Sequence, residues 1–392
     1  MNREFDVIVV GAGPVGNFFA SKVAEAGFKV AVLEKDREIG VPVRCGEGVG
    51  IGGLKMALGG YFDDRWVSYE LNSATIYSPS LYQVKLDLGD NYALILDRKI
   101  FDKALGFIAM DNGGVFFLKY YVKNLILDDN GRVVGVKAIT MTGEKELYAR
   151  LIVAADGVES KVARDYGIDT SLPLNDIEIC AQYFVYNIDI KEPSAIFYVN
   201  KEYAPGGYVW VFPKSKNTAN IGLGIIGTEA VKYSPKVLLD SFMEKFYPQA
   251  KVLNFITGAV PVARRAPKLV KNNFMIIGDA ARQVNPISGG GITYGLNAAK
   301  IAAEVAIEAL KANDLSESKL KLYEKRWDST IGKSQNKAYK LKEAIMDIKE
   351  EEYDRAAKKL QKEDKITYAK IFKTLFFTKP KLIFSVINSL FS

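Results

Sequence analysis

The chain has 392 residues, of which 48% are hydrophobic and 25% charged, as in an ordinary globular protein with a large core. It contains no histidine, which excludes a Ser-His-Asp triad, a Cys-His dyad and histidine-ligated metals, and we predict no metal site. The net charge of +7 indicates either a solvated basic surface or attraction to acidic partners such as anionic lipids or an electron donor; we expect no nucleic acid partner, since no recognition motif accompanies the charge.

The first predicted elements form a strand–turn–helix–strand unit. Residues 5–10 are a continuous apolar run, typical of a buried strand, and a glycine-rich turn at 11–16 follows at once. A helical pattern continues to about residue 26, and a second apolar run at 30–33 ends in Glu34. This order predicts a dinucleotide site, in which the carboxylate of Glu34 accepts the ribose hydroxyls and disfavours NADP.

The three glycines of the turn have separate physical roles. Gly11 permits the tight turn, Gly13 lets the backbone approach a pyrophosphate, and Gly16 allows close helix–strand packing. The helix N-terminus supplies unpaired N–H groups and the positive end of a dipole. The alternative is a structural unit in which the glycines serve only the turn, and the motif alone does not choose between NAD and FAD.

Two candidate residues follow in the next hundred positions. Cys45 lies in a loop rich in glycine and proline, where neighbouring N–H groups can lower a thiol pKa; a small buried hydrophobic residue is the alternative. Arg98 lies between a predicted strand and a predicted helix at 99–111, where it can reach a phosphate or a flavin. The alternative for Arg98 is a surface salt bridge with Asp97 or Asp102.

The middle of the chain is predicted to form a series of strands. Alternating or apolar runs predict strands at 75–88 (a pair), 115–127, 132–140, 147–155, 181–190, 195–200, 207–213, 219–226 and 252–262. The sequence Asp-Asp-Asn-Gly at 128–131 predicts a hairpin turn. From about Cys180 the strands are rich in aromatic residues, which indicates an antiparallel sheet inserted between dinucleotide-binding segments.

One of these strands carries three aromatic side chains at period two. Tyr208, Trp210 and Phe212 therefore share one face of the strand at 207–213. Such a face is either plain core or one wall of a deep apolar pocket.

The last third contains a further glycine-rich turn and a helical tail. Residues 274–281 form a buried strand ending in Gly278 and Asp279, and a glycine-rich segment leads into a helix to about residue 310. The tail from Ser316 is helical, and its apolar, lysine-flanked end at 378–391 predicts either contact with a membrane surface or packing on the body of the protein.

Five segments together resemble a known family. The glycine turn with Glu34, the Asp156-Gly157 and Gly278-Asp279 pairs, residues 42–48 (Pro-Val-Arg-Cys-Gly-Glu-Gly) and residues 203–213 (Tyr-Ala-Pro-Gly-Gly-Tyr-Val-Trp-Val-Phe-Pro) carry the resemblance. The chain resembles the FAD-dependent oxidoreductases of the para-hydroxybenzoate hydroxylase fold, and within them the geranylgeranyl reductase family, most of all the archaeal digeranylgeranylglycerophospholipid reductases.

The resemblance implies an α/β fold and FAD as cofactor. It implies a Rossmann-like FAD-binding domain of the GR2 type, an antiparallel β-sheet substrate domain and a C-terminal helical region. The corresponding ranges are 1–72 with 93–170 and 265–312, then 73–92 with 173–264, and finally 313–392. The residues expected to bind FAD are Gly11, Gly13, Val15, Gly16, Glu34, Cys45, Gly46, Gly48, Arg98, Val122, Asp279, Gly291 and Ile292.

The implied reaction is saturation of isolated C=C bonds in the prenyl chains of ether lipids in archaeal membrane lipid biosynthesis. The implied catalytic residues are Cys45, Tyr208 and Trp210, and the implied pocket wall is Tyr208, Trp210 and Phe212, whose ring faces can stabilise developing positive charge. The expected partners are a prenylated glycerophospholipid and, as electron donor, ferredoxin or NAD(P)H, since no second glycine-rich nucleotide motif follows a strand. The two cysteines fit a reducing compartment, so we expect a cytoplasmic protein, with peripheral membrane contact left open.

Two other functions stay open on the same residues. A flavin monooxygenase or halogenase of this fold would consume oxygen together with NAD(P)H. A non-enzymatic redox flavoprotein would exchange electrons and form no alkane product.

Overall fold

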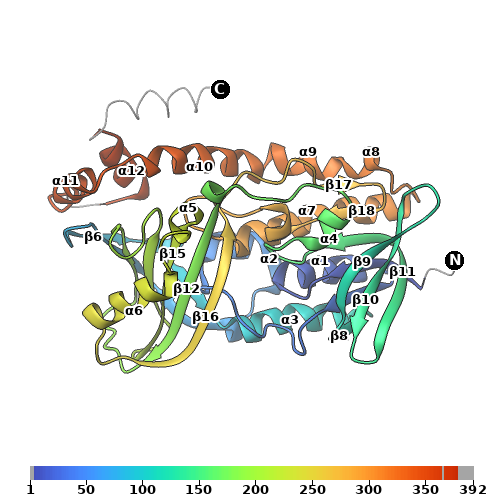
Figure 1. Ribbon diagram of the computed structural model, residues 1–392, viewed down its shortest axis with the longest axis horizontal. Helices are drawn as coiled ribbons and strands as arrows, with labels where there is room; N and C mark the ends of the chain where they lie inside the picture. Colours follow the sequence, from blue (N-terminus) through green and yellow to red (C-terminus); the bar gives the residue numbers. More distant parts are fainter. Residues whose placement is uncertain (1–3, 364–365, 378–392) are drawn as a thin grey trace. The chain divides into compact units, whose positions relative to one another are not determined.

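The computed structural model describes residues 4–363 and 366–377 (Figure 1), so the predicted apolar end at 378–391 lies outside the described residues. These residues form two compact units. Unit 1 holds residues 4–43, 98–171 and 263–336, and unit 2 holds residues 44–97, 172–262, 337–363 and 366–377. None of the helices in these ranges is long and apolar enough to cross a membrane.

Unit 1 is built on an eight-stranded sheet with helices. Its elements are β1 (Phe5–Val10), α1 (Pro14–Glu25), β2 (Val30–Glu34), α3 (Arg98–Asp111), β8 (Val115–Leu118), β9 (Tyr121–Leu127), β10 (Val133–Thr140), β11 (Gly143–Ala154), α4 (Lys161–Asp165), β17 (Val270–Lys271), β18 (Phe274–Ile276), η5 (Gly278–Ala281), α7 (Ile292–Lys311), α8 (Glu317–Leu320) and α9 (Leu322–Ser329). The main strand order is β17-β18-β11-β1-β2-β8, and β9 and β10 join through β11.

The central strands of unit 1 are parallel and buried, as the apolar runs predict. β1 lies between β2 and β11, parallel to both, and Val7, Ile8 and Val9 are fully buried. Helix α1 packs against α3 and α7. The predicted strand at 115–127 is two strands, because Lys119 adopts a left-handed backbone (φ +60°) and the chain then pairs with a different partner.

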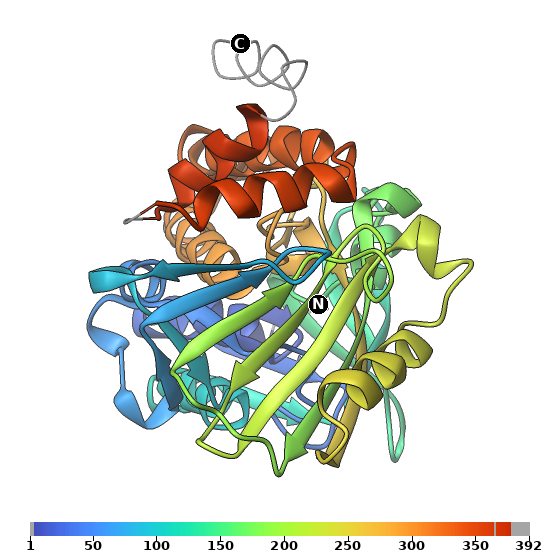
Figure 2. The ribbon, with the colours of Figure 1, turned by 90° about the vertical axis from the view of Figure 1, so that its left-hand side faces the viewer.

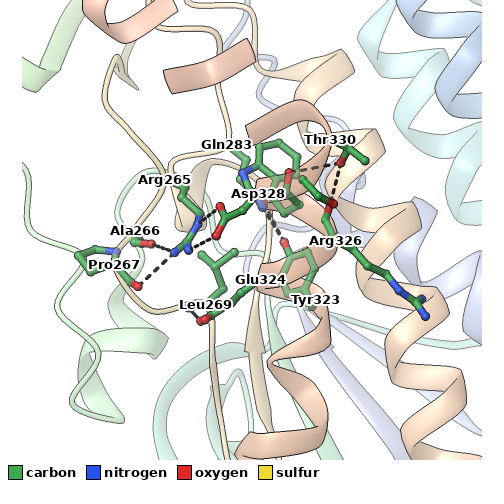
Figure 3. Close-up of polar contacts among 12 residues, drawn as sticks. Arg265, Ala266, Pro267, Leu269, Gln283, Tyr323, Glu324, Arg326, Asp328 and Thr330 are labelled. Carbon is green, nitrogen blue, oxygen red and sulfur yellow. Dashed lines mark hydrogen bonds and ion pairs between the residues drawn. The ribbon is translucent and has the colours of Figure 1, made fainter. Parts of the chain in front are cut away.

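Side chains of α9 form polar contacts that hold the segment preceding β17 in place (Figure 3). The carboxylate of Asp328 accepts from Nε and Nη2 of Arg265 at 2.7 and 2.6 Å, and Arg265 also donates to the carbonyls of Ala266 and Pro267. Glu324 accepts from the amide of Leu269 at 2.7 Å. The two hydrogen bonds between Arg265 and Asp328 form a bidentate ion pair, which is the strong form of this interaction. These contacts hold the chain that enters β17 and β18 in place.

Unit 2 is built on a seven-stranded sheet and a three-stranded sheet. Its elements are β3 (Gly48–Gly50), α2 (Ile51–Leu58), η1 (Gly59–Tyr61), η2 (Asp64–Trp66), β4 (Val67–Leu71), β5 (Ser73–Tyr77), β6 (Gln83–Asp87), η3 (Gly89–Asn91), β7 (Ala93–Leu96), η4 (Leu174–Asp176), β12 (Ile177–Tyr186), β13 (Ser194–Tyr198), β14 (Tyr208–Pro213), β15 (Thr218–Ile226), α5 (Gly227–Ala230), α6 (Pro235–Phe246), β16 (Lys251–Pro261), α11 (Glu350–Leu360) and α12 (Tyr368–Phe377). Helix α10 (Ile331–Met346) begins in unit 1 and ends in unit 2.

The large sheet of unit 2 has the order β16-β12-β15-β14-β13-β5-β6 and is antiparallel except between β13 and β5. Its two faces differ. Val209 and Val211 of β14 belong to a buried cluster that includes Leu239 and Phe242 of α6, the yellow helix against the green strands in Figure 2. The even-numbered residues of β14 point to the opposite face, because side chains alternate along a strand. The aromatic row therefore does not belong to the core under α6.

The compact units cut the chain at other places than the predicted domains. Residues 44–72 group with the antiparallel sheet in unit 2, whereas the sequence analysis assigned them to the FAD-binding domain. Residues 313–336 group with unit 1 and the described residues after 336 with unit 2. A separate C-terminal helical region stays a prediction.

Candidate functional site

In unit 1, the glycine turn after β1 is tightly packed where the sequence requires glycine. Gly11 has φ +105°, and a Cβ atom there would lie 2.4 Å from the carbonyl oxygen of Ala155. A Cβ atom on Gly16 would lie 2.1 Å from the carbonyl oxygen of Gly11. Both positions exclude any side chain, so these glycines set the approach of α1 to β1 and β11.

Gly13 is different, because the space beside it is open. It is the N-cap residue of α1, no side chain among the described residues caps this helix, and a Cβ atom on Gly13 would meet no described atom within 4 Å. The first N–H groups of a helix need partners and carry partial positive charge. The turn thus presents donors and a positive dipole end to open space of the kind that a pyrophosphate fills.

Glu34 ends β2 beside this turn. Its carboxylate accepts hydrogen bonds from the amides of Ala12 at 2.8 Å and of Asp36 at 2.9 Å. A carboxylate offers about four acceptor positions. Among the described residues these are the two hydrogen bonds found to this carboxylate, so about two positions stay available for ribose hydroxyls, while the amide bonds hold the carboxylate against the glycine turn.

Asp279 and Arg98 form a second polar group in unit 1. Burial raises the pKa of Asp279 to about 6, and the charge of Arg98 opposes this rise. Arg98 is itself paired with Asp102 at 2.6 and 2.8 Å. Asp102 is one of the two partners named in the alternative for Arg98, but the pair is not at the surface, since the two side chains are only 14% and 4% exposed. Contact of Arg98 with a phosphate or a flavin stays a prediction.

The turn at Gly278-Asp279 and the first turn of α7 pack against the side chain of Val15. Cβ atoms on Gly278 and Gly295 would lie 3.1 and 2.4 Å from its side chain. A Cβ atom on Gly291, the N-cap of α7, would lie 2.9 Å from Oδ1 of Asp279. The predicted residues from three distant segments therefore meet in one place within unit 1. Two more follow: Ile292 begins α7 and is buried, and Val122 is buried on β9.

These residues fit a dinucleotide such as FAD. The open N-terminus of α1, the free acceptor positions of Glu34 and the glycine turns are what the pyrophosphate and ribose of a dinucleotide require. The fit rests on the space beside Gly13 and the absence of a side-chain cap among the described residues.

In unit 2, the structure brings the segment 45–48 onto the aromatic row. A Cβ atom on Gly48 would lie 2.9 Å from the ring of Phe212, and one on Gly46 would lie 3.2 Å from Phe212 and 3.4 Å from Nε1 of Trp210. The rings of Tyr208, Trp210 and Phe212 follow one another at centroid distances of 6.0 and 6.4 Å. Two segments that the sequence singled out separately thus form one surface.

Hydrogen bonds continue this surface to Cys45. Nε1 of Trp210 donates to Gln182 at 2.9 Å, and Gln182 donates to the carbonyl of Cys45 at 3.1 Å. The amide of Glu47 donates to Sγ of Cys45 at 3.2 Å. Cys45 is partly exposed, so it does not match the alternative interpretation, a small buried hydrophobic residue.

The side chain of Glu47 helps to hold the segment 45–48 in place, a role that was not predicted from the sequence. It is buried, has φ +70°, and its Oε2 accepts from Nζ of Lys214 at 2.5 Å and from Asn220 at 2.7 Å. Asn220 also donates to the carbonyl of Gly46 at 3.3 Å. The signal available in the sequence was an acid between two glycines.

A second missed residue is Glu178 on β12. Burial raises its pKa to about 7, although the charge of Lys342 opposes the rise. It shares a sheet face with Cys180, whose thiol pKa is raised by burial and then by Glu178. An acid two positions before a cysteine at the start of an apolar strand was the signal for it.

The fold and these two groups of residues define a class: a two-unit α/β protein of the flavoprotein type, with a dinucleotide-binding sheet and a second, antiparallel sheet. Comparison with known proteins is more specific. Residues 176–260 match the model of the geranylgeranyl reductase catalytic domain. The chain is 41% identical over 395 residues to a digeranylgeranylglycerophospholipid reductase of Methanosarcina acetivorans, covering 98% of this chain and 96% of that protein. The chain belongs to the geranylgeranyl reductase family.

Solved structures agree with this assignment. A geranylgeranyl bacteriochlorophyll reductase-like protein from Thermoplasma acidophilum superposes with a TM-score of 0.91 at 31% identity, covering 98% of this chain and 99% of that one. The flavin-dependent brominase Bmp2 has a TM-score of 0.72 at 19% identity, covering 98% of this chain and 93% of that one. The second likeness shows a shared fold, so it gives no separate support to a halogenase reading.

Proposed function

We propose that this protein reduces C=C bonds in the geranylgeranyl chains of ether phospholipids, with FAD as its cofactor, as the names of its near full-length relatives indicate. The observation that carries the proposal is the surface in unit 2 where Gly46 and Gly48 pack on Trp210 and Phe212. It lies on a sheet to which the matched residues contribute five strands, and it combines ring faces with a glycine segment that a planar cofactor can approach.

The residues of unit 1 would hold the nucleotide part of FAD. The amides at Gly13 and Gly16 and the dipole of α1 would bind the pyrophosphate, Glu34 the ribose, and Asp279 with the N-terminus of α7 a further polar part. That Cys45, Gly46 and Gly48 contact the flavin ring stays a prediction from the sequence. When bound and reduced, the flavin supplies the hydride that an unpolarised alkene cannot obtain from a protein side chain.

The protein's own contribution to the reaction is shape and electrostatics. An isolated double bond develops positive charge at one carbon as it is reduced, and the electron-rich faces of Tyr208 and Trp210 stabilise such charge. The network of Glu47, Lys214 and Asn220 holds the segment 45–48 in place, because breaking a buried ion pair is costly. We also propose Cys45 as a residue that modulates proton delivery.

The electron donor and membrane contact are further parts of the proposal. The +7 charge favours an acidic donor such as a ferredoxin, while NAD(P)H is the other candidate. A ferredoxin reaction should slow strongly between low and high ionic strength, since surface charges are screened. Reduction by NAD(P)H would proceed without any added protein. Sedimentation with anionic vesicles tests the membrane contact.

A pair of variants tests the FAD site. Gly13→Ala should keep the melting temperature within about 2 °C of the unsubstituted protein, because one methylene-sized group enters open space, yet lose bound FAD. Gly11→Ala should lower the melting temperature, because its Cβ atom meets a carbonyl oxygen. FAD retention unchanged in Gly13→Ala would contradict the assignment of this space to the pyrophosphate.

A second pair tests the aromatic row. Tyr208→Leu should slow lipid reduction by dithionite-reduced enzyme, whereas Tyr198→Leu removes the same ring from the opposite, α6-covered face of the sheet. The control should lose stability and keep its rate per folded molecule. Equal rate losses in both variants would mean that the row at Tyr208 is core only.

A further inference from the structure

Glu178 lies on the same sheet face as the aromatic row. The register places Glu178 and Cys180 of β12 on the face that carries Gln182, and Tyr208 pairs with Gly224, which in turn pairs with Cys180. Side chains of one parity share a face. The carboxyl group therefore stands on the surface that also carries Tyr208 and Trp210, not in the core under α6.

Glycines on β15 give this carboxyl group its position. A Cβ atom on Gly224 would lie 2.9 Å from Oε2 of Glu178 and 3.2 Å from Sγ of Cys180. A Cβ atom on Gly222 would lie 2.5 Å from the Trp210 ring. The two glycines thus leave room on β15 that the carboxyl group, the thiol and the indole ring fill.

The side chain of Glu178 is nearly buried and has no polar partner among the described residues. Glu178 is 8% exposed, and no hydrogen bond or ion pair joins its carboxyl group to another residue in the described parts of the chain. Buried polar groups normally have such partners, so an acid without one on the face of the aromatic row calls for a role.

The titratable groups around Glu178 do not neutralise it. Cys180 faces it from its own strand and Tyr208 from β14, while its neighbours on β15 and β16 are Ile226 and Val260. In the described parts of the chain, the cation that acts on it is Lys342 of α10, which is already bonded to Asp176 at 2.8 Å and to the carbonyl of Val262 at 2.7 Å.

We infer that Glu178 is the proton donor for the reduction: it gives its carboxyl proton to the alkene carbon that does not receive the hydride. This rests on the proposed function. The reductant delivers two electrons and one proton as hydride to one carbon. The π electrons of the double bond form the new C–H bond with the Glu178 proton, the O–H bond breaks, and its electrons stay on the carboxylate. Water returns the proton after each turnover.

Glu178→Gln keeps the size of the side chain and removes the acidic proton. The FAD-loaded full-length variant, reduced with dithionite, should reduce a digeranylgeranyl phospholipid at least about 100-fold more slowly, the usual contribution of a positioned acid. Its KM for the lipid should stay unchanged. Glu192→Gln is the matched control, since that acid pairs with Lys85 on the exposed surface of the same sheet and should keep the full rate.

A second readout does not depend on turnover. Infrared difference spectra of the FAD-loaded protein between acidic and alkaline pH should show a protonated carboxyl band that shifts in D₂O, disappears as pH rises through about 7, and is missing in Glu178→Gln, whereas the contribution of Asp279 at lower pH stays in both proteins. In the unsubstituted enzyme, the rate of lipid reduction should fall over the same pH range. If Glu178→Gln does not fold, Glu178→Asp should keep the band and the pH dependence at a reduced rate.

The failures are distinguishable. An unsubstituted enzyme that reduces the lipid, together with a Glu178→Gln variant of similar rate or an unchanged carboxyl band, overturns the role of Glu178 and leaves the proposed function intact. An unsubstituted enzyme that binds FAD and never reduces the lipid overturns both.

Discussion

Removing the acid at position 178 should change how stability depends on pH. On folding, the pKa of Glu178 rises from 4.5 to about 7, so the folded state binds more protons than the unfolded state between these values. Stability is therefore lost as pH rises through this window. Each pKa unit corresponds to about 1.36 kcal/mol, so the ionised carboxylate costs the folded protein about 3 kcal/mol above pH 7.

Urea unfolding at several pH values measures this difference. Glu178→Gln should match the unsubstituted protein near pH 4.5 and exceed its free energy of unfolding by about 3 kcal/mol at pH 8. Asp279 titrates in a similar window, but its effect cancels because it is present in both proteins. Glu192→Gln should show the pH dependence of the unsubstituted protein. Parallel pH curves for Glu178→Gln and the unsubstituted protein would refute the reasoning.

Two further changes test the supports of the sites. Lys214→Met should lower the free energy of unfolding by about 3 kcal/mol, because it leaves Glu47 charged and buried. Adding Glu47→Gln should restore much of this loss. Urea titration of both variants measures the two changes, and a loss that Glu47→Gln does not restore would contradict the prediction. Arg265→Gln should cost about 2 kcal/mol through the lost bidentate pair with Asp328, measured the same way, whereas a change within error would show that the pair in Figure 3 contributes nothing net.

Much of unit 1 could be predicted from local sequence. The run at 5–10, the glycine turn and the acid at 34 each act over a few residues, and the structure has β1, α1 and β2 where they predict them. The hairpin at 128–131 is also confirmed, since β9 and β10 pair on either side of it. Local backbone preference and the spacing of apolar residues suffice to predict an element whose secondary structure is determined by its own sequence.

The unpredicted features depend on contacts between distant segments. The strand expected to start at 181 starts at Ile177, because pairing with β15 and β16 extends it, and Glu178 and Cys180 are thereby carried into the sheet. Period two placed the three aromatic residues on one face, but only the structure shows that α6 covers the other face and that Phe212 packs on a second buried cluster. The burial of the Arg98–Asp102 pair likewise follows from packing that no local pattern encodes.

The most direct test of the account is a single turnover without oxygen. FAD-loaded protein reduced by dithionite, freed of excess reductant and mixed with a digeranylgeranyl glycerophospholipid should return to the oxidised, yellow state as the lipid gains two hydrogen atoms for each flavin oxidised, measured by absorbance and mass spectrometry. A lipid of unchanged mass beside a flavin that stays reduced until oxygen is admitted would contradict the account.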